Sequence, residues 1–191
     1  MARPAARLKK EVVSGNMSGT DNRYETVHNG QQDIAAVFRY HEDRLAALRD
    51  IAAGISAEMK DLSAFIEQHT AVVCPECRSV CCINLHSYHT FDDIVYLYAR
   101  EEKIPRHTAG LVDSDPCQFL GKTGCSIQRD LRPYRCNWYF CTPLLDHIVE
   151  HNSCRHYRCF INLLERITGK RQKMMENVQF RLNCVKYLQS V

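Results

Sequence analysis

The chain has 191 residues, of which 45% are hydrophobic and 25% are charged, close to the average of folded globular proteins. This composition excludes a wholly disordered chain and a collagen-like one, and the formal net charge of +3 is too small to indicate nucleic-acid binding by itself. Cysteine departs from the average, because ten of the 11 cysteines lie in the 86 residues from Cys74 to Cys159.

Residues 1–30 are rich in Gly, Ser, Asn and charged residues without apolar periodicity, so we expect a disordered tail. The longest apolar run near the start is two residues, which argues against a secretory signal peptide. Glu11, Asp21 and Glu25 disfavour a mitochondrial presequence, and no run of about 18 apolar residues predicts a transmembrane helix. We therefore expect a cytoplasmic protein, in which clustered cysteines are metal ligands or redox groups rather than disulfides.

Residues 31–70 are predicted to form a long helix or a helical hairpin. Apolar residues recur at alternating spacings of three and four, as in a heptad pattern: Leu45, Leu48, Ala52, Ile55, Met59, Leu62 and Ile66. A break near Gly54 would give the hairpin, because glycine costs about 1 kcal/mol in a helix interior. The stripe from Leu45 to Ile66 either packs on the chain's own body or forms a seam with a second copy or a partner helix.

The segment 71–191 is predicted to be a cysteine-cluster metal-binding domain. It begins with four cysteines in nine residues, Cys74, Cys77, Cys81 and Cys82. Two thiolates separated by two residues readily bind one metal, because the turn between them directs its amides toward the sulfurs. Packing explains a single cysteine, but four at this spacing indicate metal ligands.

A helix from Phe91 to about Lys103 is expected next. The Thr90 hydroxyl is placed to accept from the third amide of this helix, and the Asp93 carboxylate lies in its first turn. Pro105 limits the helix, because proline removes a backbone donor and clashes with the preceding turn.

The second cysteine group consists of Cys117, Cys125, Cys136 and Cys141. Gly121 and Gly124 suit a tight turn that returns the chain after Cys117 toward its own start. Three arginines lie within this group, Arg129, Arg132 and Arg135. Four thiolates on a divalent metal leave a net charge of about −2, which guanidinium groups offset. The alternative for each arginine alone is a solvated basic loop.

The joint pattern resembles a known family. C-x-x-C-x-x-x-C-C followed by C-x-F-L-x-x-x-G-C-S-I-x-x-x-x-R-P-x-x-C is similar to the YkgJ-type cysteine-cluster family, a zinc- or iron-chelating domain whose signature also occurs in flagellin lysine N-methylases. The resemblance covers about residues 74–141, with three residues rather than two before the double cysteine. It implies seven metal ligands and an Arg-Pro pair at the cofactor: Cys74, Cys77, Cys81, Cys82, Cys117, Cys125 and Cys136, with Arg132 and Pro133.

A last group lies outside the resemblance: His147, His151, Cys154, His156 and Cys159. His147 and His151 share one face if the segment is helical and then suit a transition metal, and the alternative is a pair of surface histidines. Two further helices are expected, from Phe160 to Thr168 with Gly169 as the stop, and from Met174 to the C-terminus with Cys184 as a core thiol. No alternating strand pattern is found.

These observations predict a mainly α protein with an irregular cysteine-rich centre. Cysteine-only sites suit zinc and iron–sulfur clusters alike, and the surplus over four thiols indicates two centres or spare cysteines. The adjacency of Cys81 and Cys82 favours an iron–sulfur cluster, because adjacent side chains more easily serve different metals. The alternatives are a metal-dependent redox or group-transfer enzyme and an adaptor with a structural metal. An enzyme would need a pocket, for which four aromatic residues are candidates: Tyr134, Trp138, Tyr139 and Phe140.

Overall fold

The computed structural model describes residues 34–35, 37–38, 45–77, 80–84, 86–108, 110–112, 114–122, 124–151 and 154–189, with the side chains of 84, 154 and 184–189 excepted. Over these residues the chain is mainly helical, which confirms the predicted fold class. The predicted tail 1–30 lies outside the described residues.

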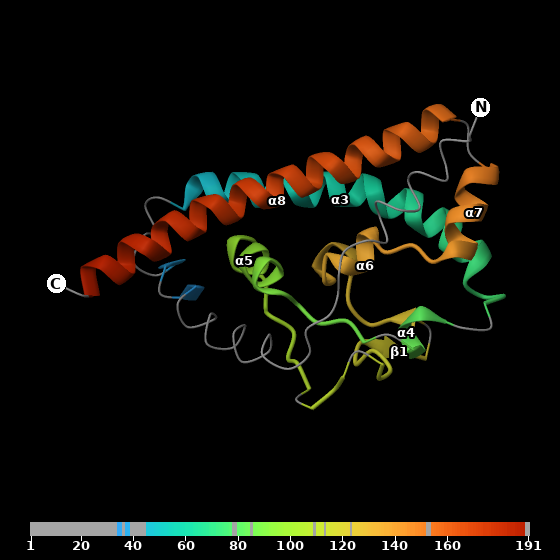
Figure 1. Ribbon diagram of the computed structural model, residues 1–191, viewed down its shortest axis with the longest axis horizontal. Helices are drawn as coiled ribbons and strands as arrows, with labels where there is room; N and C mark the ends of the chain where they lie inside the picture. Colours follow the sequence, from blue (N-terminus) through green and yellow to red (C-terminus); the bar gives the residue numbers. More distant parts are fainter. Residues whose placement is uncertain are drawn as a thin grey trace.

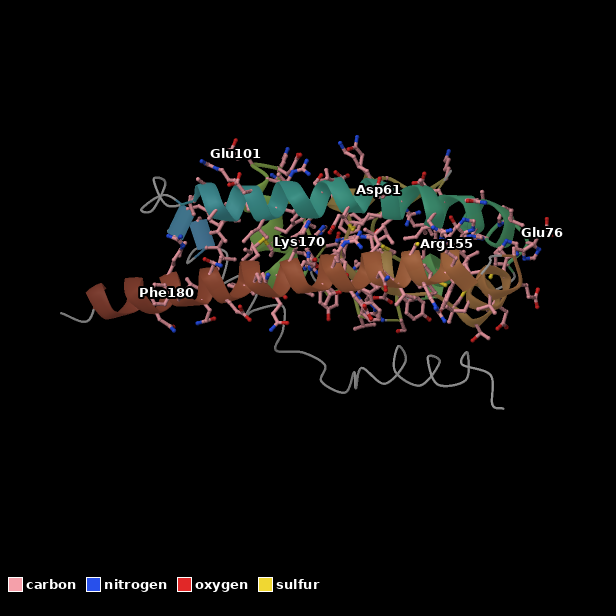
Figure 2. All side chains as sticks on the ribbon, turned by 90° about the horizontal axis from the view of Figure 1, so that it is seen from above. Asp61, Glu76, Glu101, Arg155, Lys170 and Phe180 are labelled. Carbon is pink, nitrogen blue, oxygen red and sulfur yellow. The ribbon has the colours of Figure 1, made fainter. Side chains whose placement is uncertain are left out.

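Two long helices form the frame of the molecule. Helix α3 (Ala46–Val73) and helix α8 (Cys154–Gln189) run antiparallel and side by side, as Figures 1 and 2 show from two directions. The Glu58 carboxylate of α3 pairs with Arg166 at 2.9 Å and with Lys170 at 3.2 Å on α8. The two helices are therefore joined by ion pairs along the edge of their apolar contact.

The heptad stripe of α3 is buried inside this single chain. Its members are at most 3% exposed: Leu45, Leu48, Ala52, Ile55, Met59, Leu62 and Ile66. They belong to one core with the buried residues of α8, which include Phe160, Ile167, Met174 and Val178. The stripe thus packs on the chain's own body, one of the two alternatives that its spacing left open.

Gly54 and Gly169 both lie within unbroken helices, so the long-helix alternative holds over α3. Gly54 lies inside the unbroken helix α3, where its carbonyl accepts from the Lys170 ammonium at 3.4 Å. The predicted stop at Gly169 is wrong, because α8 continues through it for 36 residues in all. Ile167 and Met174 are fully buried on either side of Gly169. Burial of such side chains contributes about 1.5–3 kcal/mol each, which outweighs the cost of about 1 kcal/mol for a helical glycine.

Helix α5 (Phe91–Ala99) begins as predicted and ends four residues early. The Thr90 side chain accepts from the Asp93 amide, while the Asp93 carboxylate accepts from the Thr90 amide at 2.9 Å. The helix ends because Glu101 adopts a left-handed backbone with φ of 56°, and the Glu102 amide bonds back to the Leu97 carbonyl at 3.0 Å. This closure of the last turn is the one that glycine usually provides, so the residue types did not reveal it.

The remaining elements are short, and all but α4 lie between α5 and α8 in the chain. They are α4 (Cys81–Asn84), a hairpin of β1 (Leu120–Gly121) and β2 (Gly124–Cys125), the 3₁₀ turn η2 (Arg129–Leu131), α6 (Arg135–Trp138) and α7 (Thr142–His151). The tight turn at Gly121 and Gly124 was predicted, but the two strands that flank it were not. Figure 1 shows α4, β1 and α6 on one side of the long helix pair, with α7 at its end. Among the described residues, no helix is both long and apolar enough to cross a membrane.

Candidate metal centre

The first cysteines lie where α3 ends. The Cys74 amide donates to the Thr70 carbonyl at 3.0 Å, so this residue closes the last turn of α3. The Cys77 amide donates to the Cys74 carbonyl at 3.2 Å, which folds the C-x-x-C segment into a tight turn. Cys81 then begins the single turn of α4. A backbone hydrogen bond therefore holds Cys74 and Cys77 in one turn at the end of α3, and Cys81 starts the next described helix.

A second set of backbone bonds gathers cysteines far apart in the sequence. The Cys117 amide donates to the Cys82 carbonyl at 2.7 Å. The β1–β2 hairpin returns the chain as predicted, with Leu120 opposite Cys125. Gly124 has φ of 118°, a conformation that favours glycine, and a side chain at Gly121 would meet the Gly124 carbonyl oxygen at 3.2 Å.

Helix α6 and the start of α7 supply the remaining two cysteines. The Cys136 thiol donates to the Ser87 hydroxyl at 3.3 Å. Burial, opposed by this hydrogen bond and reinforced by the thiols of Cys117, Cys125 and Cys82, raises the pKa of Cys136 to about 11. The Cys141 carbonyl accepts from the Leu145 amide at 3.0 Å, which places this cysteine at the entry of α7.

The electrostatic contacts among the thiols connect eight cysteines, and the larger contacts favour two groups of four that meet at Cys81, Cys82 and Cys74. In the first sulfur set, burial and the nearby thiol of Cys141 raise the pKa of Cys81 to about 11, with further contributions from Cys82 and Cys77. Burial, Cys141 and Cys77 likewise raise the pKa of Cys74. The first sulfur set is therefore Cys74, Cys77, Cys81 and Cys141.

The second sulfur set is centred on Cys82. Burial raises the pKa of this thiol, and the thiols of Cys117 and Cys125 raise it further. Cys136 interacts with the same three residues. We assign Cys82 to the second sulfur set with Cys117, Cys125 and Cys136, because its larger contacts are with Cys117 and Cys125. Its contacts with Cys74 and Cys81 connect the second set to the first.

Two of the three arginines in the second cysteine group face sulfurs. The Arg132 guanidinium opposes the rise in the pKa of Cys82, and its Nε donates to the Ile127 carbonyl at 2.9 Å. The Arg129 guanidinium opposes the rise in the pKa of Cys74 and pairs with Glu67 at 3.3 Å. Arg135 instead lines a cavity beside α6. Arg129 also interacts with Cys125, so it acts on thiols of both sulfur sets, whereas Arg132 acts on Cys82 of the second set. Both guanidinium groups lower the free-energy cost of forming a thiolate.

The third group of candidate ligands lies on α7 and α8. Cys159 is exposed on α8, and the side chains of Cys154 and Cys184 lie outside the described residues. The rings of His147 and His151 stack with centroids 4.1 Å apart on α7, as their spacing predicts. His69 of α3 joins them with its ring 5.3 Å from that of His147. No spacing in the sequence links residues 69 and 147, so His69 was missed.

The thiols of the two sulfur sets are suitable metal ligands, although the described side chains do not adopt a coordination geometry. Within the part of the chain that the structure describes, no three Cys, His, Asp or Glu side chains stand in ligating geometry. The nine described cysteines are free thiols. Four thiolates per set is the number that zinc or an iron–sulfur cluster takes. A bound cation would replace thiol protons, which is the usual course of metal binding by cysteine.

The four aromatic residues proposed to wall a pocket divide in two. Tyr134 and Trp138 line the cavity beside α6, whereas Phe140 is 7% exposed in the core and Tyr139 is 42% exposed.

Comparisons of the chain with protein-family models, with curated proteins and with solved structures found no match. Any proposal about function must therefore be argued from the residues of this chain.

Proposed function

We propose that this protein binds metal through eight cysteine thiolates, as two centres of four sulfurs each. The observation that carries the proposal is the division of the thiols into the first and second sulfur sets, with the adjacent Cys81 and Cys82 in different sets. One tetrahedral ion uses four thiolates, so eight in two groups match two ions or clusters. The resemblance of residues 74–141 to the YkgJ-type family points to the same chemistry.

Arg129 and Arg132 support this proposal by their placement. Four thiolates around a divalent ion carry a net charge of about −2. The Arg132 guanidinium acts on a thiol of the second sulfur set, and that of Arg129 acts on thiols of both sets. Guanidinium groups beside an iron–sulfur cluster would raise its reduction potential, because positive charge and hydrogen bonds near the sulfurs stabilise the reduced state. A zinc ion in the same sets would serve structure, since zinc has no redox chemistry.

Serine substitutions in each set test the division into two centres. Cys77→Ser and Cys125→Ser each remove one sulfur from a different set, so each variant should keep about half of the bound metal and the double variant should lose nearly all. Cys159→Ser is the matched control, because Cys159 is a free thiol outside both sets. Metal content is measured after gel filtration, with helicity recorded by circular dichroism. A variant of either set that keeps all of its metal contradicts the assignment.

One observation favours a second candidate function. The cavity beside α6 adjoins the helix that carries Cys136, and an enzyme built on the metal would need such a pocket. Under this alternative the second sulfur set would act on a bound small molecule, in redox or group-transfer chemistry. Turnover that is lost in Cys125→Ser while ligand binding persists would distinguish it from a purely structural metal.

A further inference from the structure

A cavity of about 430 Å³ lies between the start of α5, helix α6 and the middle of α8. This volume falls within the range of about 300–1,000 Å³ that is usual for small-molecule sites. Its walls combine aromatic, charged and hydroxyl side chains from all three elements, among them Tyr88, Asp92, Tyr134, Arg135, Trp138 and Arg171. The two sulfur sets contribute no side chain to these walls.

One side of the cavity is held rigid by a buried ion pair. The Arg171 guanidinium donates to the Asp93 carboxylate at 2.7 Å, and the same carboxylate oxygen accepts from the Tyr134 amide at 3.1 Å. The guanidinium also lies over the Tyr134 ring, 4.5 Å from its centroid. The Tyr134 hydroxyl is 2.8 Å from that of Thr168. These contacts join α5, α6 and α8, and the two charges cancel each other.

Two other charged side chains of the cavity, Asp92 and Arg135, are not held in an ion pair of this kind. Among the described residues, neither Asp92 nor Arg135 forms an ion pair. Both side chains are only partly exposed. Burial raises the pKa of Asp92, against the opposing effect of Arg171, which is the response of a carboxylate without a close partner. The cavity therefore offers one carboxylate and one guanidinium to a ligand.

The charge balance selects the kind of ligand. An anion would be attracted by Arg135 but repelled by the carboxylate of Asp92. A cation would be attracted by Asp92 but repelled by Arg135. A neutral apolar molecule would desolvate both groups without pairing either, which costs free energy. A molecule with both charges pairs both groups. Trp138, Tyr88 and the partly buried Met175 supply an apolar surface for the remainder of the ligand.

We propose that the cavity binds a zwitterion of the α-amino-acid type with an aromatic or long apolar side chain. Its carboxylate pairs with Arg135 and its ammonium group pairs with Asp92. The side chain packs against Trp138 and Tyr88, where aromatic contacts add to the area buried. The rigid side formed by Asp93, Arg171 and Tyr134 shapes the cavity before the ligand arrives, which lowers the entropy cost of binding.

The sequence offers a direct probe, since Trp138 is the only tryptophan of the chain. L-Phenylalanine is titrated into the protein, with Trp138 fluorescence and calorimetry as independent measurements. Two analogues each lack one charge: 2-phenylethylamine has no carboxylate, and 3-phenylpropionate has no ammonium group. The proposal expects L-phenylalanine to bind at least about tenfold more tightly than either analogue, because each loses one charge-assisted pairing.

Two charge-removing substitutions then assign the pairings. Arg135→Gln should weaken L-phenylalanine and 3-phenylpropionate by about tenfold or more and leave 2-phenylethylamine unchanged. Asp92→Asn should weaken L-phenylalanine and 2-phenylethylamine and leave 3-phenylpropionate unchanged. Arg155→Gln and Asp61→Asn are matched controls, because both side chains are exposed and lie away from the cavity on α8 and α3 (Figure 2).

Three results would overturn the proposal. They are calorimetry that detects no binding of L-phenylalanine, equal affinity for the amino acid and both analogues, and losses in the Asp92 and Arg135 variants that do not depend on which charge the ligand carries. These titrations measure ligand affinity and not metal content, so failure of this proposal and failure of the proposed metal binding are distinguishable.

Discussion

The Asp93 carboxylate joins three helices, and its substitution by asparagine should be strongly destabilising. Four donors converge on its two oxygens: the amide and hydroxyl of Thr90, each at 2.9 Å, the Tyr134 amide at 3.1 Å and the Arg171 guanidinium at 2.7 Å. Asp93→Asn replaces one acceptor oxygen by an NH₂ group, which then faces two donors. The change also leaves the Arg171 charge buried without its partner.

The size of the effect depends on burial. The side chains of Asp93 and Arg171 are 4% and 9% exposed. Removing one partner of a buried pair costs about 3–5 kcal/mol, a large share of the roughly 5–15 kcal/mol that is typical of a folded domain. The matched surface pair is Arg49 with Glu101, joined at 2.8 Å but 39% and 70% exposed. Glu101→Gln should therefore cost only about 0.2–1 kcal/mol.

Urea denaturation followed by circular dichroism measures both free energies of unfolding. We expect Asp93→Asn to shift the midpoint far more than Glu101→Gln. In Asp93→Asn combined with Arg171→Met, the buried charge is gone. The double variant should therefore be more stable than the sum of the single effects implies, by about 1 kcal/mol or more. Equal costs for Asp93→Asn and Glu101→Gln, or strict additivity in the cycle, would refute the claim that burial makes this pair decisive.

Three further predictions concern stability. Gly169→Ala should stabilise α8 by about 0.5–1 kcal/mol, since a Cβ there meets nothing within 4 Å, and an unchanged thermal midpoint would contradict this. Burial and the nearby His147 and His151 hold the pKa of His69 below its ordinary value of 6.5. The unfolded chain then takes up a proton below about pH 6.5 that the folded chain does not, so stability falls as the pH falls, and His69→Leu should lessen that fall in thermal midpoints measured against pH. Leu62→Asp should abolish the helical circular dichroism signal rather than merely change the mass seen by light scattering, because Leu62 is fully buried within one chain.

The sequence was sufficient to predict those features that depend on residues close together in the chain. The capping box of Thr90 and Asp93 forms as the residue types predict, because both partners lie within one turn. The heptad spacing of α3 revealed its buried face for the same reason. The strands β1 and β2 were missed because two residues are too few to show an alternation of apolar and polar side chains.

Tertiary contacts decided what local signals could not. Gly169 reads as a helix stop in isolation, but burial of its neighbours in the core shared with α3 keeps the helix intact. At the candidate metal centre, the spacing identified the cysteines but not their grouping. Cys141 joins Cys74, Cys77 and Cys81 across more than fifty residues of sequence, and only the folded chain shows that contact.

The most direct test of the proposed metal binding is the metal content of the protein purified without oxygen under reducing conditions. We expect metal that stays bound through gel filtration, as two centres per chain. Iron with acid-labile sulfide and a brown colour that bleaches with dithionite would identify iron–sulfur clusters, and a colourless protein with stoichiometric zinc would identify zinc. A folded, fully reduced protein that retains neither metal would contradict the proposal of two metal centres.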